Sequence, residues 1–272
     1  MRSVIMAFSM YSRIPMPKIK WDEKRMQYSL CFFPLVGLTL GGCGVLLYFI
    51  CERLHFQSMT RALLQAALPI LLTGGIHMDG YLDVTDAKNS WKPAEEKLKI
   101  LKDPHIGAFA CIYAIIYLML TTAFMNEITF QQTVHMAVCY TYSRILSGLS
   151  VVWFRKAKKD GMVAENAKSS APGVKWILIV ELVLCISVLL LMGCALPGSF
   201  GMGSFGMGNF ALRNFLPGLV SAVLGLACFF RYRHMAYKTF GGTTGDLAGY
   251  FLQACELLML IGTVCSGRAV WG

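Results

Sequence analysis

Residues 30–51 read LCFFPLVGLTLGGCGVLLYFIC, a stretch of 22 residues that contains no charged side chain. About 20 apolar residues in a helix are long enough to cross the hydrocarbon core of a bilayer. Such a run must be helical there, because its backbone polar groups find no water and have to bond to one another. This segment therefore predicts a membrane span.

Six further apolar runs extend this pattern along the chain. Three of them are as clear as the first, namely 106–125, 174–196 and 246–265. The other three are weaker, namely 62–76, 134–154 and 215–230. Only 15% of the residues are charged, whereas a water-soluble domain carries about 25%. The sequence predicts an all-α fold, a polytopic membrane bundle of about seven helices that forms a single catalytic domain over residues 1–272.

The basic residues between the runs predict the orientation of the chain. Arg144 lies inside an apolar run and is not counted. Of the segments outside the runs, taken in order from the N-terminus, the first, third, fifth and seventh together hold 20 Lys and Arg residues, and the second, fourth, sixth and eighth hold 4. Positive charge stays on the cytoplasmic side, so we expect a cytoplasmic N-terminus in a bacterial inner membrane and an external C-terminus. The Gly-rich stretch 198–210 then falls in an external loop.

The net charge of +10 and the ten cysteines have simple explanations in this setting. The charges lie in loops, where they set orientation and contact anionic lipid, and no basic stripe with interleaved aromatic residues indicates nucleic acid. The cysteines form no CxxC pair, and most lie inside apolar runs. They are expected to be small packing residues and not disulfides or zinc ligands.

The most informative segment is TGGIHMDGYLDVTDA at residues 73–87. At about 100° per residue, Asp83 lies about 40° from Asp79 around the helix axis, and Asp86 lies about 20° from Asp79 in the opposite direction. The three therefore share one helical face. One Asp at a helix end would be an ordinary solvated residue, but three in phase repel one another. All-oxygen ligands of this kind suit Mg²⁺ or Ca²⁺, and Mg²⁺ commonly bridges carboxylates to substrate phosphates. His77 points away from this face and is expected to be a packed or capping residue.

Three other segments bring polar groups to the same predicted side of the membrane. Asp103 lies just before the span at 106–125, where it could bind the metal or cap a helix. The sequence FGGTTGDLAGY at 240–250 offers backbone N–H groups for phosphate and Asp246 for a metal or a cap. Arg144 lies about 13 Å into its span, where it either binds phosphate or joins two helices in an ion pair.

At these residues the chain resembles the cobalamin synthase family, adenosylcobinamide-GDP ribazoletransferase. The similar segments follow one another along most of the chain: FSMYSRIPMP, GGIHMDGYLDVTDA, ILKDPHIGAFA, YSRILSG and GGTTGDLAGY. Ala87 and Pro104 depart from the family pattern, which usually has Gly and Ser there. Both are flanking positions, so they affect local backbone geometry more than chemistry.

The resemblance implies a transferase that joins adenosylcobinamide-GDP to α-ribazole or its 5′-phosphate, releases GMP and needs Mg²⁺. This is the assembly of the nucleotide loop in cobalamin biosynthesis. It implies acidic positions at Asp79, Asp83, Asp86, Asp103 and Asp246 and basic ones at Arg13 and Arg144. We expect metal at Asp79, Asp83, Asp86 and Asp103, with Asp103 or Asp246 as base. Phosphate would be held by Arg13, Arg144, Gly241, Gly242, Thr244 and Gly245.

Two other functions fit parts of the pattern. A CDP-alcohol phosphotransferase has a similar acidic motif, but that motif carries an Arg after its second Asp, and none follows Asp79 at the matching place. A cation transporter would place carboxylates within the spans, whereas these lie at one face of the membrane. The bilayer is the expected partner, and association with further copies of the chain is left open.

Overall fold

The computed structural model describes residues 2–17, 26–157, 162–195 and 209–271. Within these residues the chain is helical, and β-structure is confined to one isolated parallel bridge between Lys156 and Thr243. The predicted external loop at 198–210 lies outside the described residues except at its end, where α11 begins. The all-α prediction is confirmed.

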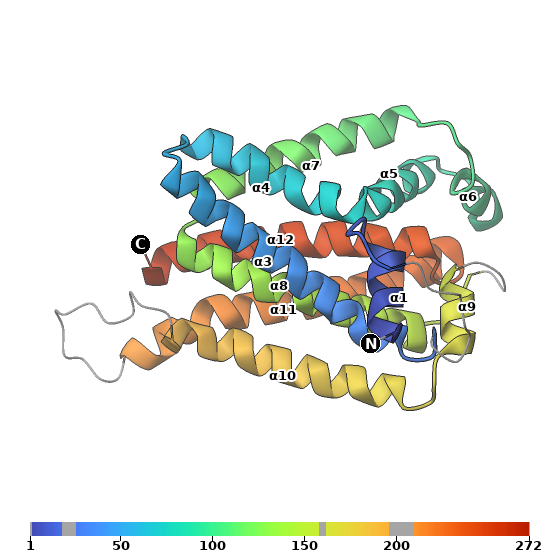
Figure 1. The fold of residues 1–272 in the computed structure, drawn as a ribbon. Coiled ribbons are helices and arrows are strands. Elements are labelled where there is room, and N and C mark those ends of the chain that lie inside the picture. Colours follow the sequence, from blue (N-terminus) through green and yellow to red (C-terminus); the bar gives the residue numbers. More distant parts are fainter. Residues whose placement is uncertain (1, 18–25, 158–161, 196–208, 272) are drawn as a thin grey trace.

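Each apolar run predicted to span the membrane coincides over most of its length with one helix, although the run at 62–76 continues past the end of its helix, through Gly74 and Gly75, to Ile76. These helices are α3 (Phe33–Arg53, preceded by the 3-10 turn η1, Ser29–Phe32), α4 (Ser58–Thr73), α7 (Ala108–Glu127), α8 (Phe130–Trp153), α10 (Val174–Ala195), α11 (Asn209–Phe240) and α12 (Gly245–Trp271). Shorter helices connect them: α1 (Arg2–Tyr11), α5 (Ile76–Asn89), α6 (Ala94–Ile100) and α9 (Met162–Ser169). Figure 1 shows α1, α5, α6 and α9 at one end of the bundle and the α3–α4 and α7–α8 turns at the other.

Five of the described helices are long and apolar enough to cross a membrane, or up to six if the bent pair α4 and α5 counts as one span. Helix α8 does not reach that composition, although it is one of the longest helices. It packs against α3, α10 and α12 and buries Gln132, His135 and Arg144. A helix shielded from lipid by its neighbours can carry such side chains. The number of crossings and their orientation remain predictions.

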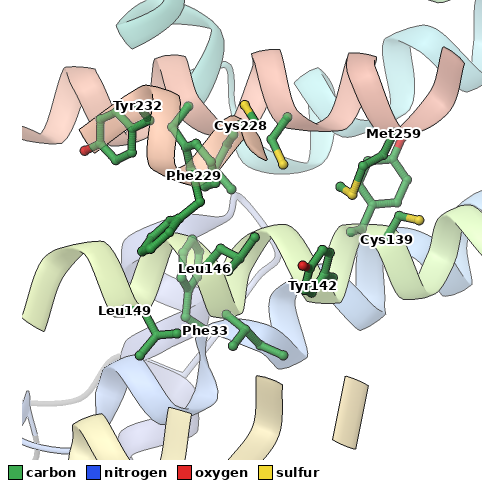
Figure 2. Close-up of a cluster of buried hydrophobic side chains, with 14 of the residues drawn as sticks. Phe33, Cys139, Tyr142, Leu146, Leu149, Cys228, Phe229, Tyr232 and Met259 are labelled. Carbon is green, nitrogen blue, oxygen red and sulfur yellow. The ribbon is translucent and has the colours of Figure 1, made fainter. Parts of the chain in front are cut away.

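The core lies around α8. Figure 2 shows Tyr142, Leu146 and Leu149 of α8 between Phe33 below and Phe229 above, in a cluster of buried apolar side chains. Helices α7 and α10 behave differently, since they present large apolar side chains outward, such as Ile115 and Val183. Apolar residues on the outer face are what a lipid environment requires.

The cysteines of the described residues are free thiols, most of them buried. They include Cys139 and Cys228, which belong to the core cluster in Figure 2. Six of the nine described cysteines are thus buried packing residues as predicted, whereas Cys111 and Cys265 are exposed.

A sharp bend separates α4 from α5. The two helix axes meet at 95°, and Gly74 and Gly75 at the bend have φ values of 67° and 80°. These are left-handed backbone conformations that residues with a Cβ atom rarely adopt. The N–H of Gly75 donates to the carbonyl of Ile70 (2.8 Å), which closes the last turn of α4. The bend turns the acidic helix α5 across the end of the bundle.

Candidate active site

Helix α5 carries the three aspartates as one continuous helix, so the predicted common face exists. Asp83 is half-buried and lies within electrostatic range of Asp79, Asp246 and Asp86. Among the described residues neither Asp79 nor Asp83 has an ion-pair partner. The protein therefore gathers negative charge here without a described basic side chain in contact with these two groups.

Asp86 has a defined structural partner. One of its carboxylate oxygens accepts a hydrogen bond from the N–H of Gly107 (2.6 Å) and the other from the N–H of Ala110 (2.9 Å). These are the N-cap and third residue of α7, whose first N–H groups have no partner within the helix. The expected metal ligand Asp86 thus caps the N-terminus of α7 and ties it to α5.

Asp246 comes to the acidic face from the first turn of α12. The two helices touch at Gly80, where a Cβ atom would lie 2.6 Å from the carbonyl oxygen of Asp246. Gly249 lies one turn further along α12, and a Cβ atom there would also come too close to the backbone of His77. The absence of side chains at Gly80 and Gly249 allows this approach, and it places a fourth carboxylate beside Asp83.

Gly80 offers a test of this packing. We expect Gly80→Ala to lower thermal stability by about 1–3 kcal/mol and to reduce activity, because the new methyl group must push α12 and Asp246 away from α5. Gly42→Ala on α3 is the matched control, since a Cβ atom there meets no atom within 4 Å. Thermal unfolding in detergent measures both variants, and equal stability of the two would contradict the proposed close contact.

The glycine turn before α12 was expected to offer its backbone N–H groups to phosphate, but two of these groups donate to carbonyls of the protein. The N–H of Gly242 donates to the carbonyl of Ala236 (3.1 Å), and that of Thr243 to the carbonyl of Arg155 (2.8 Å). Gly241 accepts a hydrogen bond from the Arg155 side chain (2.9 Å). Gly241 is therefore tied to the α8–α9 connection and Gly242 to α11, and neither is among the residues that line the cavity described next.

A cavity of about 710 Å³ opens beside the acidic groups. It lies at the end of the bundle that carries α1, α5 and α9 (Figure 1). Asp79, Thr244, Gly245 and Asp246 form part of its wall. The other lining residues are Tyr11, Leu30, Phe33, Ile76, His77, Leu101, Lys102, Ser147, Val151, Val163, Ala164, Asn166, Thr243, Ala248, Gly249 and Leu252.

Asp103 does not join these carboxylates, contrary to the expectation for a metal ligand or base. Its side chain is about half exposed and accepts hydrogen bonds from the backbone N–H of His105 (3.0 Å) and from the His105 ring (2.7 Å). These bonds hold the pKa of Asp103 below its usual range. Asp103 organises its own turn, lies outside the cavity wall, and is not among the charged groups that act on Asp83.

Arg144 forms the buried ion pair that was one of its two expected roles. The side chain is 1% exposed and pairs with Glu256 of α12, which is also buried. Ser143 donates to the same carboxylate (3.0 Å) and accepts from Arg144 (2.9 Å). Arg144 does not line the cavity, and its guanidinium joins α8 to α12. Sequence reasoning missed Glu256, which sits in an otherwise apolar run.

Arg13 lies at the bend between α4 and α5. Its backbone N–H donates to the carbonyl of Leu72 (2.8 Å), and its side chain lies across Gly74, within 2.8 Å of where a Cβ atom would be. It is exposed and outside the cavity wall. In this position Arg13 supports the bend that orients α5.

Two further polar residues of the cavity wall had no clear signal in the sequence. Asn166 of α9 is 3% exposed and donates to the Tyr11 hydroxyl (3.0 Å), which joins α9 to α1. His77 was expected to be a packed residue, and it is indeed buried. It also lines the cavity, and its Nδ1 atom has no hydrogen-bond partner in the described part of the chain.

The acidic residues fit a magnesium ion only in part. No group of three or more His, Cys, Asp or Glu side chains within the described ranges is arranged to hold a metal. The four-carboxylate site expected from the sequence is therefore not preformed, because Asp86 and Asp103 have other partners. Mg²⁺ commonly binds one or two carboxylates and takes its other ligands from water and substrate phosphates. Asp79 and Asp83, with Asp246 beside them, suit that kind of site.

Comparison with known proteins gives consistent matches along the chain. Residues 3–264 match the family described as cobalamin-5-phosphate synthase. A protein of Lachnoclostridium phytofermentans named adenosylcobinamide-GDP ribazoletransferase is 39% identical over 274 residues, which cover 100% of this chain and 97% of the relative. A protein of the same name from Clostridium perfringens is 28% identical, over 97% of this chain and 98% of the relative. Another from Treponema denticola is 29% identical, over 96% of each chain. No solved structure matches.

Proposed function

The chain belongs to the cobalamin-5-phosphate synthase family, and we propose that it is a membrane-embedded ribazoletransferase. It joins adenosylcobinamide-GDP to α-ribazole, or to α-ribazole 5′-phosphate, and releases GMP. The observation that carries this proposal is the family match over nearly the whole chain. The cavity beside Asp79 and Asp246 supports it, because it gives the reaction a place on the protein.

The reaction exchanges the phosphoanhydride bond of the GDP group for a phosphodiester bond to the ribazole. A hydroxyl oxygen of the ribazole forms a bond to the phosphorus nearer the cobinamide, and the bond from that phosphorus to the bridging oxygen of the pyrophosphate breaks. GMP leaves with the bridging oxygen, and the hydroxyl proton passes to a base. Such a transfer needs positioning and charge neutralisation more than a protein nucleophile.

The residues around the cavity suit these needs. Asp246 lies at the cavity wall, half-buried, and we retain it as the base in preference to Asp103. Asp79 and Asp83, with Asp246 beside them, would hold Mg²⁺, which would neutralise the phosphate oxygens when substrate is bound. Thr244 and Gly245 at the start of α12 place the positive end of a helix dipole at the same wall.

The direct experiment uses purified protein in detergent with adenosylcobinamide-GDP, α-ribazole and Mg²⁺. Mass spectrometry should detect GMP and adenosylcobalamin in equal amounts, and chelation of the metal should stop both. α-Ribazole 5′-phosphate as acceptor should give the corresponding cobalamin phosphate. Metal-dependent GMP release separates this enzyme from a cation transporter with acidic residues, which would release none.

We propose that the cavity faces the cytoplasm, where activated nucleotides are made. Single cysteines placed at Ser90 after α5 and at Lys238 near the end of α11 should react only with reagent admitted to the inside of the cell. A cysteine at Gln57, in the turn at the other end of the bundle, should react from the outside (Figure 1). The background should lack the native cysteines. Labelling of Ser90 and Lys238 from opposite sides would refute the seven-crossing arrangement.

A further inference from the structure

The wall of the cavity has two chemically different parts. Asp79, Thr244 and Asp246 form an acidic and polar edge where α5 meets the start of α12. The larger part is apolar and comes from η1, α3, α8, α9 and α12. Its members are Leu30, Phe33, Val151, Val163, Ala164 and Leu252. A ligand that fits this space has one charged or polar end and one apolar end.

Three rings stand next to one another along the wall. The Tyr11 and Phe33 ring centroids are 4.2 Å apart, and the Phe33 and His77 ring centroids are 6.3 Å apart. The hydrogen bond from Asn166 to the Tyr11 hydroxyl fixes the first ring in place. The third ring, His77, and Asp79 both line the cavity, so the aromatic wall adjoins the acidic edge. Flat bases bind to such ring surfaces by stacking.

The size of the cavity restricts the ligand. A volume of about 710 Å³ lies in the range of roughly 300–1,000 Å³ that is typical of sites for small organic molecules. A nucleoside fits within it. A corrin macrocycle with its amide side chains and adenosyl group is far larger than a nucleoside, so the corrinoid must remain outside with only its phosphate arm at the acidic edge.

Chemistry separates the two nucleosides of the reaction. Guanine has several donors and acceptors along its edge, and the mainly apolar wall has few side chains to pair with them, because Asn166 already bonds to Tyr11 and Ser147 offers a single hydroxyl. The benzimidazole base of α-ribazole has no N–H donor once it is attached to ribose, and its methyl groups are apolar. A mainly apolar wall with three neighbouring, mutually tilted rings therefore suits the acceptor base better than guanine.

Resting on the proposed function, we infer that this cavity is the acceptor subsite. It binds the ribazole with its bicyclic base against Tyr11, Phe33 and His77 and with its ribose hydroxyls directed toward Asp79 and Asp246. The GDP-bearing corrinoid approaches from outside the cavity and presents its pyrophosphate at the acidic edge. Phe33 is then a specificity-determining residue for the acceptor.

Two variants test the inference. Phe33→Leu removes one ring but keeps an apolar side chain, and Val163→Phe on the short helix α9 fills the cavity. Each should raise the KM for α-ribazole about tenfold, the size of one lost base–ring contact, while the KM for adenosylcobinamide-GDP stays unchanged. Phe229→Leu is the matched control, because Phe229 is equally buried but lies in the core outside the cavity wall. Its kinetics should equal those of the native chain.

Equilibrium dialysis of labelled α-ribazole against the purified protein, without corrinoid, measures the same subsite independently of catalysis. Weaker binding to Phe33→Leu and Val163→Phe than to Phe229→Leu supports the inference. An altered KM for adenosylcobinamide-GDP with unchanged α-ribazole binding would assign the cavity to guanine and overturn the inference. Unchanged values of both the KM for adenosylcobinamide-GDP and α-ribazole binding would also overturn it. If no substrate pair releases GMP, the proposed function fails, whereas α-ribazole dialysis still decides whether the cavity binds this nucleoside.

Discussion

Replacing Asp79 by Asn should lower turnover about 100- to 1,000-fold, the usual loss when one preorganised electrostatic contact to the reacting groups is removed. The substitution keeps the shape of the side chain but removes the charge that would hold Mg²⁺ at the cavity wall. Folding should survive, because Asp79 is exposed and repulsion among the neighbouring carboxylates decreases. Steady-state kinetics at limiting and saturating Mg²⁺ measure the loss, which should be partly relieved at high metal concentration.

Asp103→Asn is the matched control for this prediction. The same chemical change is made in the same acidic part of the sequence, but Asp103 bonds to its own turn and lies outside the cavity wall. We expect turnover within a few fold of the native value. Normal turnover in Asp79→Asn, or a comparable loss in both variants, would contradict the assignment of the site to the α5–α12 contact.

Breaking the buried pair of Arg144 and Glu256 should have the largest effect on stability. Arg144→Met leaves Glu256 as an uncompensated charge in the core, which costs about 3–5 kcal/mol for a buried pair. The variant should unfold at a markedly lower temperature in detergent. The double variant Arg144→Met, Glu256→Met should recover much of the loss, because it removes both charges and keeps apolar volume between α8 and α12.

Kinetics distinguish this structural role from phosphate binding. In the folded fraction of Arg144→Met, the KM for adenosylcobinamide-GDP should equal that of the native chain, because Arg144 does not line the cavity. A large increase in this KM in the double variant, whose stability is restored, would return Arg144 to the substrate site. Unfolding is measured by thermal scans, and the KM by GMP release at varied substrate.

The apolar runs were sufficient to predict the helical fold, and the acidic motif was sufficient to predict that three aspartates share one helical face. The runs are long enough that local composition decides their helical form, and three aspartates in phase on 76–89 can be recognised without a structure. Helix α8 was the weakest of these predictions by composition, because its polar residues are shielded by other helices and not by local sequence.

The sequence alone determined which segments are helical and which carboxylates could act together, because both depend on spacing along one chain segment. Only the tertiary structure decided how those groups are used. Helix packing through Gly80 and Gly249 brought Asp246 to Asp79 and Asp83, and the N-terminus of α7 took Asp86 as its cap. Arg144 paired with Glu256 away from the cavity wall, since a buried guanidinium needs a countercharge. These outcomes depend on contacts between residues far apart in the chain.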